Sequence, residues 1–136
     1  FTEAEKPWLP FATRSKEINV QTDETSGKSV LLFYRKLLRL RNASDVLRRG
    51  SYETLHLDTD YYAYCRREKN FGQFNGLNYK NEEYIIICNF EKESHIAGYS
   101  EDYECVLTNY AARNGETRAV NGSYAPYECA VFKKHN

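Results

Sequence analysis

The sequence contains no methionine, and this is its most informative absence. A complete, unprocessed translation product begins with methionine, so we expect this chain to be one piece of a longer protein. It opens in an irregular stretch with two prolines, at residues 1–10, and a single predicted helix precedes segments that all have strand-like patterns. Because a lone helix ahead of an all-β chain usually packs on something upstream, we expect the chain to be a C-terminal piece that need not perform its parent's function alone.

An excess of one charge is also absent, as are long apolar runs. Lys and Arg number 19 and Asp and Glu number 19, so the formal net charge is zero. A neutral chain has no electrostatic attraction for nucleic acid or anionic lipid. No apolar run approaches the roughly 20 residues that a membrane-spanning helix requires. We therefore expect no nucleic-acid partner and no membrane partner.

Cysteine is scarce, and each of the four cysteines lies in a strand-like run: Cys65, Cys88, Cys105 and Cys129. Their spacing matches no zinc or redox motif. We expect small, buried side chains that carry free thiols. Two disulfides, in one of three possible pairings, are the alternative. Disulfide-rich scaffolds are usually smaller and richer in cysteine, which favours the free thiols.

One strong helical pattern is present, from Lys28 to Asn42. Residues 1–27 are expected to be irregular or extended, because prolines oppose a helix there. The apolar residues of the helix cover about half of its circumference, a wider stripe than an ordinary amphipathic helix carries. We therefore predict that the helix is covered on more than one side. Arg41 falls inside the apolar arc, so we expect it to have a partner. The arc comprises Val30, Leu31, Phe33, Tyr34, Leu37 and Leu38.

After Gly50 the apolar pattern changes to a period of two, which is typical of strands. Strands are predicted at residues 52–57, 61–68, 83–90, 95–96, 104–108, 118–120 and 128–133. The first two are expected to form a hairpin, and residues 83–90 a central strand because they are apolar on both faces. The long loop at 69–81 separates them. The predicted fold is mainly β: an antiparallel Greek-key β-sandwich, preceded by an extended segment and one long α-helix.

No motif that carries chemistry is complete. Gly27-Lys28-Ser29 resembles the end of a phosphate loop, but Thr22 occupies the position of the required first glycine, so we expect Ser26 or Ser29 to cap the helix instead. The three histidines show no ligand spacing and are expected at the surface or at strand edges: His56, His95 and His135. The sequence thus nominates no catalytic residue, no cofactor-binding residue and no metal ligand, and we expect no cofactor.

A series of short motifs runs through the chain in a characteristic order. The first are Lys6-Pro7-Trp8-Leu9-Pro10, Lys16-Glu17-Ile18-Asn19-Val20, Phe33-Tyr34-Arg35-Lys36-Leu37 and Leu40-Arg41. The later ones are Gly50-Ser51-Tyr52-Glu53, Tyr62-Ala63-Tyr64-Cys65-Arg66, Asn89-Phe90, Thr108-Asn109-Tyr110 and Ala125-Pro126-Tyr127-Glu128-Cys129. Together they resemble the end of alpha-glucosidases of the alpha-amylase superfamily, in the group of oligo-1,6-glucosidases, exo-acting alpha-glucosidases and trehalose-6-phosphate hydrolases. The resemblance omits residues 69–81 and much of 91–102.

This resemblance implies a TIM-type barrel followed by an antiparallel β-sandwich. Residues 1–45 would end the catalytic barrel, with the segment after its eighth strand and its eighth helix, and residues 46–136 would form the sandwich. In such enzymes two barrel carboxylates perform retaining hydrolysis and a third assists, and all three would lie before Phe1. The implied partners are the missing catalytic barrel of the parent chain and the parent's oligosaccharide substrate. The implied parent is cytoplasmic.

Two other functions stay open at this point. One is a free-standing β-sandwich that binds carbohydrate or a partner protein, and the other is a catalytically silent relative that forms the ectodomain of a transporter subunit. The codons directly upstream of Phe1 separate the three. Barrel-strand motifs in frame would support the enzyme, a secretion signal the free sandwich, and a single membrane span before a barrel the transporter subunit.

Overall fold

The computed structural model describes residues 6, 8–27, 29–68, 82–110 and 119–135. The contacts group the chain into two compact units, Phe1–Arg35 and Lys36–Asn136. Helix α2 (Val30–Ala43) contains the boundary between the two units. Among the described residues, no helix is both long and apolar enough to cross a membrane. The predicted division into residues 1–45 and 46–136 stays a prediction.

The first unit contains a short helix, α1 (Val20–Thr25), where irregular or extended chain was expected. The prediction was wrong for this stretch. It rested on the prolines at residues 7 and 10 and did not take into account that Asn19 can cap a helix. The Asn19 side chain accepts a hydrogen bond from the Thr22 backbone N–H at 2.9 Å, as an N-cap residue does. The prolines lie too far upstream to interfere. Glu24, near the end of α1, pairs with Arg35 of α2 at 2.6 Å.

The long predicted helix is α2, displaced by one or two residues from the expected 28–42. Ser29 caps it as predicted, since its hydroxyl accepts from the Leu32 N–H at 3.3 Å. None of its residues is buried, and only Leu37 and Leu40 pack against the buried core of the second unit. Arg41 was expected to need a partner. It is exposed instead, and the described residues offer its side chain no hydrogen bond or ion pair.

A short helix, α3 (Asp45–Arg49), follows α2. Ser44 is its N-cap, accepting from the Leu47 N–H at 3.2 Å. At the other end, Arg66 donates to the Val46 and Leu47 carbonyl oxygens, each at 3.4 Å. A helix this short shows no helical apolar period, so the sequence pattern alone does not reveal it.

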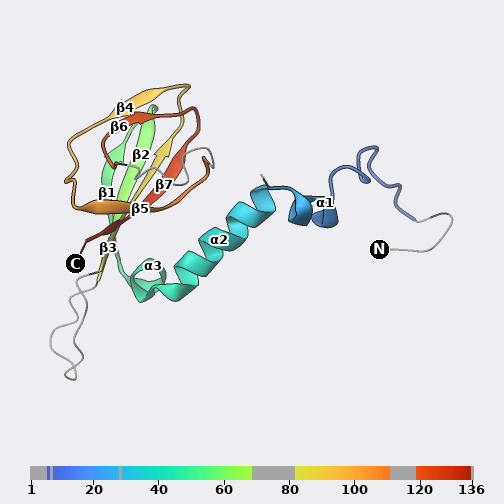
Figure 1. Ribbon diagram of the computed structural model, residues 1–136, viewed down its shortest axis with the longest axis horizontal. Coiled ribbons are helices and arrows are strands. Elements are labelled where there is room, and N and C mark those ends of the chain that lie inside the picture. The colour runs from blue at the N-terminus through green and yellow to red at the C-terminus, as the bar shows by residue number, and fades with distance from the viewer. Residues whose placement is uncertain (1–5, 7, 28, 69–81, 111–118, 136) are drawn as a thin grey trace, which may run out of the picture. The chain divides into compact units, whose positions relative to one another are not determined.

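The strands form one large and one small antiparallel sheet (Figure 1). The large sheet has the order β1-β2-β3-β7-β5, and the small one pairs β4 with β6. The bounds are β1 Ser51–Leu57, β2 Tyr61–Arg67, β3 Glu83–Asn89, β4 Ser94–Ile96, β5 Tyr103–Thr108, β6 Gly122–Tyr124 and β7 Cys129–Lys134. The predicted β1–β2 hairpin and the central place of β3 are confirmed. The last strand, β7, lies between β3 and β5, so the spatial order differs from the chain order.

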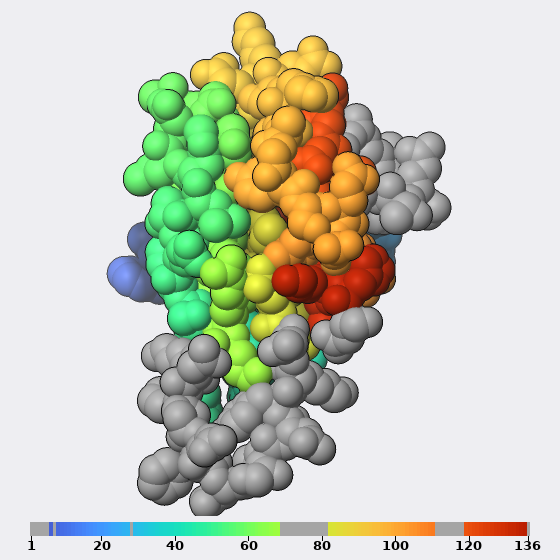
Figure 2. Space-filling model, turned by 90° about the vertical axis from the view of Figure 1, so that its left-hand side faces the viewer, coloured from blue at the N-terminus to red at the C-terminus, as the bar shows by residue number. Residues whose placement is uncertain are grey.

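Each face of the large sheet has its own core. Ile85 and Ile87 of β3 and Phe132 of β7 point to one face, where they pack with Ile96 of β4 and Tyr124 of β6. In the space-filling view, the yellow and orange segments with β4 and β5 lie beside the green β1–β2 hairpin (Figure 2). The two sheets therefore form an antiparallel β-sandwich, as predicted.

The alternate residues of the central strands point to the opposite face of the large sheet. There Tyr84 and Ile86 of β3 and Val131 of β7 form a second cluster with Val46 of α3. This arrangement explains the apolar residues on both sides of β3, because each side faces a core.

Strand β6 begins later than expected. A strand was predicted at 118–120, and residue 118 lies outside the described residues. Ala119 and Val120 are not in a strand, and β6 begins at Gly122, whose φ of 124° suits glycine. The preceding Asn121 side chain accepts from the Tyr99 N–H and donates to the Tyr99 carbonyl, at 3.0 and 2.8 Å. This contact between distant segments positions the turn, and local sequence patterns do not reveal it. The predicted loop at 69–81 lies outside the described residues.

Candidate functional site

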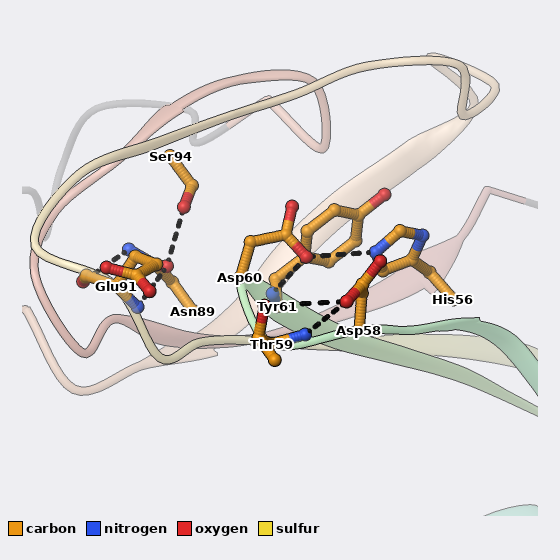
Figure 3. Close-up of polar contacts among 8 residues, drawn as sticks. All are labelled: His56, Asp58, Thr59, Asp60, Tyr61, Asn89, Glu91 and Ser94. Atoms are coloured by element: carbon orange, nitrogen blue, oxygen red, sulfur yellow. Dashed lines mark hydrogen bonds and ion pairs between the residues drawn. The ribbon is translucent and has the colours of Figure 1, made fainter.

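Three side chains that could bind a metal ion meet at the turn between β1 and β2 (Figure 3). His56, Asp58 and Asp60 each offer one ligand atom, and these atoms lie within 4.8 Å of one another. We call these residues the turn cluster. His56 was expected at the surface or at a strand edge, without a ligand partner, but a histidine followed by two alternating aspartates was a signal in the sequence for such a cluster.

Local geometry assembles the turn cluster. The β1–β2 register shifts between Thr54 and His56, as at a β-bulge. The turn is closed by the Asp58 N–H, which donates to the Tyr61 carbonyl at 3.3 Å. Asp58 also accepts from the Thr59 N–H at 2.7 Å. The His56 ring stacks on the Tyr61 ring with centroids 3.8 Å apart and planes 5° from parallel.

The Asp60 carboxylate makes polar contacts with both His56 and the backbone of β2. Its Oδ1 lies 3.1 Å from His56 Nε2 and accepts from the Tyr61 N–H at 2.8 Å. The hydrogen bond with His56 and then that with the Tyr61 N–H hold the pKa of the Asp60 carboxyl below its usual value. The carboxylate is therefore the favoured form in the folded hairpin.

The turn cluster has the residue types of a divalent-cation site, since carboxylate oxygens and imidazole nitrogens are common metal ligands. A cation would have to compete with the His56–Asp60 contact for the same atoms. All the contacts described above lie within the turn itself. The arrangement therefore serves first as a hairpin connection, in which stacking and hydrogen bonds join the end of β1 to the start of β2.

A second polar group lies beside the turn cluster, at the end of β3 (Figure 3). Asn89 is only 2% exposed. Its amide donates to the Ala125 and Glu91 carbonyls at 2.8 and 3.2 Å. Its side-chain oxygen accepts from the Glu91 N–H at 3.0 Å and the Ser94 hydroxyl at 2.8 Å. One buried side chain thus satisfies backbone groups of two loops, which gives the Asn89-Phe90 motif a structural role.

The side chain of Asn109, in the Thr108-Asn109-Tyr110 motif, also bonds to backbone groups of a segment distant in sequence. Its side chain accepts from the Cys129 N–H at 2.9 Å and donates to the Tyr127 carbonyl at 3.0 Å. The hydroxyl of Tyr110 donates to the Pro126 carbonyl at 2.5 Å. These contacts join the end of β5 to the start of β7. The polar side chains of the later motifs thus hold the sandwich together.

The remaining side chains considered in the sequence are placed as follows. None of the four cysteines forms a disulfide, as expected, but only Cys65 is buried, and the other three are half-buried, which was not expected. The structure brings Cys88 and Cys129 together, with their sulfur atoms 2.9 Å apart, a pairing that spacing along the chain did not reveal. His95 and His135 are exposed, as expected for surface histidines.

Comparison with known proteins gives consistent matches. Residues 1–50 match the family described as the catalytic domain of alpha-amylase. The chain is 32% identical to an oligo-1,6-glucosidase of Bacillus cereus, over 98% of this chain and 22% of that protein. It is 30% identical to a trehalose-6-phosphate hydrolase of Bacillus subtilis, over 93% of this chain and 22% of that protein. The chain thus spans about a fifth of the length of the relatives it matches.

A solved structure supports the fold. The trehalose-6-phosphate hydrolase of Bacillus licheniformis superposes with a TM-score of 0.72 at 24% identity, over 96% of this chain and 22% of that chain. Almost the whole chain therefore shares its fold with one part of a much longer protein. Sequence and structure together identify the chain as related to the C-terminal part of the alpha-glucosidases of the alpha-amylase superfamily, in the group of oligo-1,6-glucosidases and trehalose-6-phosphate hydrolases.

Proposed function

We propose that this chain is the C-terminal supporting part of a cytoplasmic glycoside hydrolase that cleaves α-glucosidic bonds with retention of configuration. In this proposal the catalytic carboxylates belong to the parent's barrel, and the chain itself is not catalytic. Its partner is that barrel, and the oligosaccharide is a substrate of the parent as a whole. In this proposal the sandwich closes the barrel and covers only the side of its last helix on which Leu37 and Leu40 lie, and the barrel covers the rest of that helix.

The observation that carries the proposal is the exposure of large apolar side chains in the first unit. Trp8 is 91% exposed and Val30 is 83% exposed. Several other apolar residues of this unit are more than half exposed: Leu9, Phe11, Ile18, Val20 and Tyr34. Burying one large apolar side chain contributes roughly 1.5–3 kcal/mol. A surface that covered several of these side chains would therefore stabilise this unit by several kcal/mol.

The match to a catalytic domain falls on the same region. Residues 1–50 carry that match and include every residue of the exposed set. A covering surface supplied by the rest of a catalytic barrel therefore accounts for both findings. In contrast, the polar motif residues at the ends of β3 and β5 bond to the backbone of the sandwich. They serve structure, which fits a supporting part.

This proposal predicts that the chain alone hydrolyses no glucoside. We would assay the purified chain, and the same chain joined to the segment encoded directly upstream, with a chromogenic α-glucoside and with isomaltose. The joined protein should turn over at least one of them, whereas the chain alone should match a heat-denatured control. Turnover by the chain alone that survives repurification would refute the proposal.

Product stereochemistry tests the remaining part of the proposal. The sugar first released by the joined protein should have the α configuration, because a glycosyl-enzyme intermediate gives retention. Release of the β anomer would exclude the two-step mechanism. An upstream segment that encodes a secretion signal directly before Phe1 would favour the free-standing, carbohydrate-binding sandwich instead.

A further inference from the structure

Cys88 and Cys129 lie directly opposite each other on neighbouring strands. Cys88 is in β3, Cys129 is in β7, and the antiparallel register pairs the two residues. Their sulfur atoms are 2.9 Å apart. Both side chains are half-buried at the face of the sheet that carries the second cluster. Neither thiol has a role in the function proposed above.

The backbone around this pair has the geometry that a disulfide requires. The Asn89 N–H donates to the Glu128 carbonyl at 2.8 Å, so the β3–β7 hydrogen bond falls just beyond the pair. The N–H and carbonyl of Cys129 are directed the other way, to Asn109 on the β5 side, at 2.9 and 3.2 Å. The cysteines therefore occupy a non-hydrogen-bonded position. At such positions Cα atoms are about 4.5 Å apart, within the range that disulfides span without backbone movement.

The two thiols differ in acidity. A hydrogen bond from Cys129 stabilises the Cys88 thiolate and lowers the pKa of Cys88, although burial opposes this. The same hydrogen bond, together with burial, raises the pKa of Cys129. A thiolate is the attacking form in thiol–disulfide exchange. Cys88 is therefore suited to attack a disulfide first, and Cys129 to attack the mixed disulfide that this forms. The buried Cys65 provides a contrast, since burial raises its pKa to about 11.

We propose that Cys88 and Cys129 form a dithiol site that a low-molecular-weight disulfide, such as oxidised glutathione, converts into a cross-strand disulfide between β3 and β7. In the first step the Cys88 thiolate attacks one sulfur of the small disulfide, forms a mixed disulfide and releases one small thiolate. In the second step Cys129 gives up its proton to solvent and attacks the Cys88 sulfur, which releases the second small thiolate. Two protein thiols are oxidised and one small disulfide is reduced to two thiols, so electrons and atoms balance.

The bond would join two strands whose cysteines are 41 positions apart in the chain. Because a cross-link that closes a long loop restricts the unfolded chain, the oxidised protein should be the more stable form. Its thermal midpoint should exceed that of the reduced protein by about 5 °C or more. This inference stands on the sandwich alone and does not depend on the proposed function.

The test is oxidation of the full, folded chain with excess oxidised glutathione at pH 8, followed by alkylation under denaturing, non-reducing conditions and mass spectrometry. The reduced chain should show four alkylated cysteines and the oxidised chain two, Cys65 and Cys105, with Cys88 linked to Cys129. In the Cys129→Ala variant the reaction should stop at a mixed disulfide on Cys88. The matched control is Cys105→Ala, which alters a half-buried strand cysteine with a different neighbourhood and should leave the cross-strand bond unchanged.

Three outcomes would overturn the proposal. The first is a wild-type chain that keeps four alkylatable thiols after oxidation. The second is a bond that involves Cys65 or Cys105. The third is a mixed disulfide at Cys88 that persists in the wild-type chain. All three are read on the unaltered chain, so a variant that fails to fold does not obscure the result.

Discussion

Replacing Asn89 by alanine should lower the free energy of unfolding of the sandwich by about 3 kcal/mol. The side chain is buried and makes four hydrogen bonds, three to backbone groups of Glu91 and Ala125 and one to the Ser94 hydroxyl. Alanine leaves several of these groups without a partner, and each buried group left unpaired costs about 1–3 kcal/mol. Since small domains are stable by only about 5–15 kcal/mol, this is one of the largest effects we expect from a single substitution.

Urea unfolding of the two proteins, followed by circular dichroism, measures this difference. Asn42→Ala is the control, because Asn42 is an exposed asparagine near the end of α2, and its loss should change stability by no more than about 0.5 kcal/mol. Equal midpoints for Asn89→Ala and the control would show that the Asn89 contacts contribute nothing to the sandwich.

Replacing Gly50 by alanine should destabilise the protein by about 2 kcal/mol. A Cβ atom at this position would lie 2.4 Å from the Arg67 carbonyl oxygen and 2.5 Å from that of Val46. Both oxygen atoms belong to the backbone, so the clash cannot be relieved by the movement of a flexible side chain. The junction of α3 and β1 would have to shift, which strains the Gly50 N–H bond to Val46, now 2.9 Å long.

The control for this substitution is Gly27→Ala, because a Cβ atom there meets nothing within 4 Å. Thermal unfolding of both variants should show a clear loss only for Gly50→Ala. If the two variants unfold at the same temperature, the close approach of the backbone at Gly50 is not a constraint. The motif that begins at Gly50 would then need another explanation.

Two parts of the sandwich could be predicted from the sequence, because the burial of a strand determines which of its positions are apolar. Ile85, Ile86 and Ile87 face two cores in succession, so the central position of β3 follows from apolar residues on both faces. The β1–β2 hairpin is equally legible, because two strand-like segments flank the short polar turn at residues 58–60. In both cases the strand can be predicted from its own residues, because the pattern of apolar and polar side chains within it reflects which of them are buried.

What the sequence did not reveal depends on contacts between distant segments. Asn121 bonds to Tyr99 and thereby displaces β6 from its predicted position. Cys88 and Cys129 meet only because β7 pairs with β3 in one register, and no spacing rule encodes that pairing. The turn cluster was missed for a different reason, because a histidine and two aspartates were judged by known ligand spacings and not by their place around a tight turn.

Hydrogen exchange at α2 tests the central claim most directly, which is that the first part of this chain is a surface for the parent's catalytic barrel to cover. We would compare backbone exchange of residues 30–43 with that of residues 83–89, in a strictly monomeric sample of the chain and in the chain joined to its upstream segment. In the chain alone, α2 has no buried residue and should exchange much faster than β3. In the joined protein, α2 should become protected. Equal protection of α2 and β3 in the monomeric chain alone would contradict the account, because the chain would then be a self-sufficient domain.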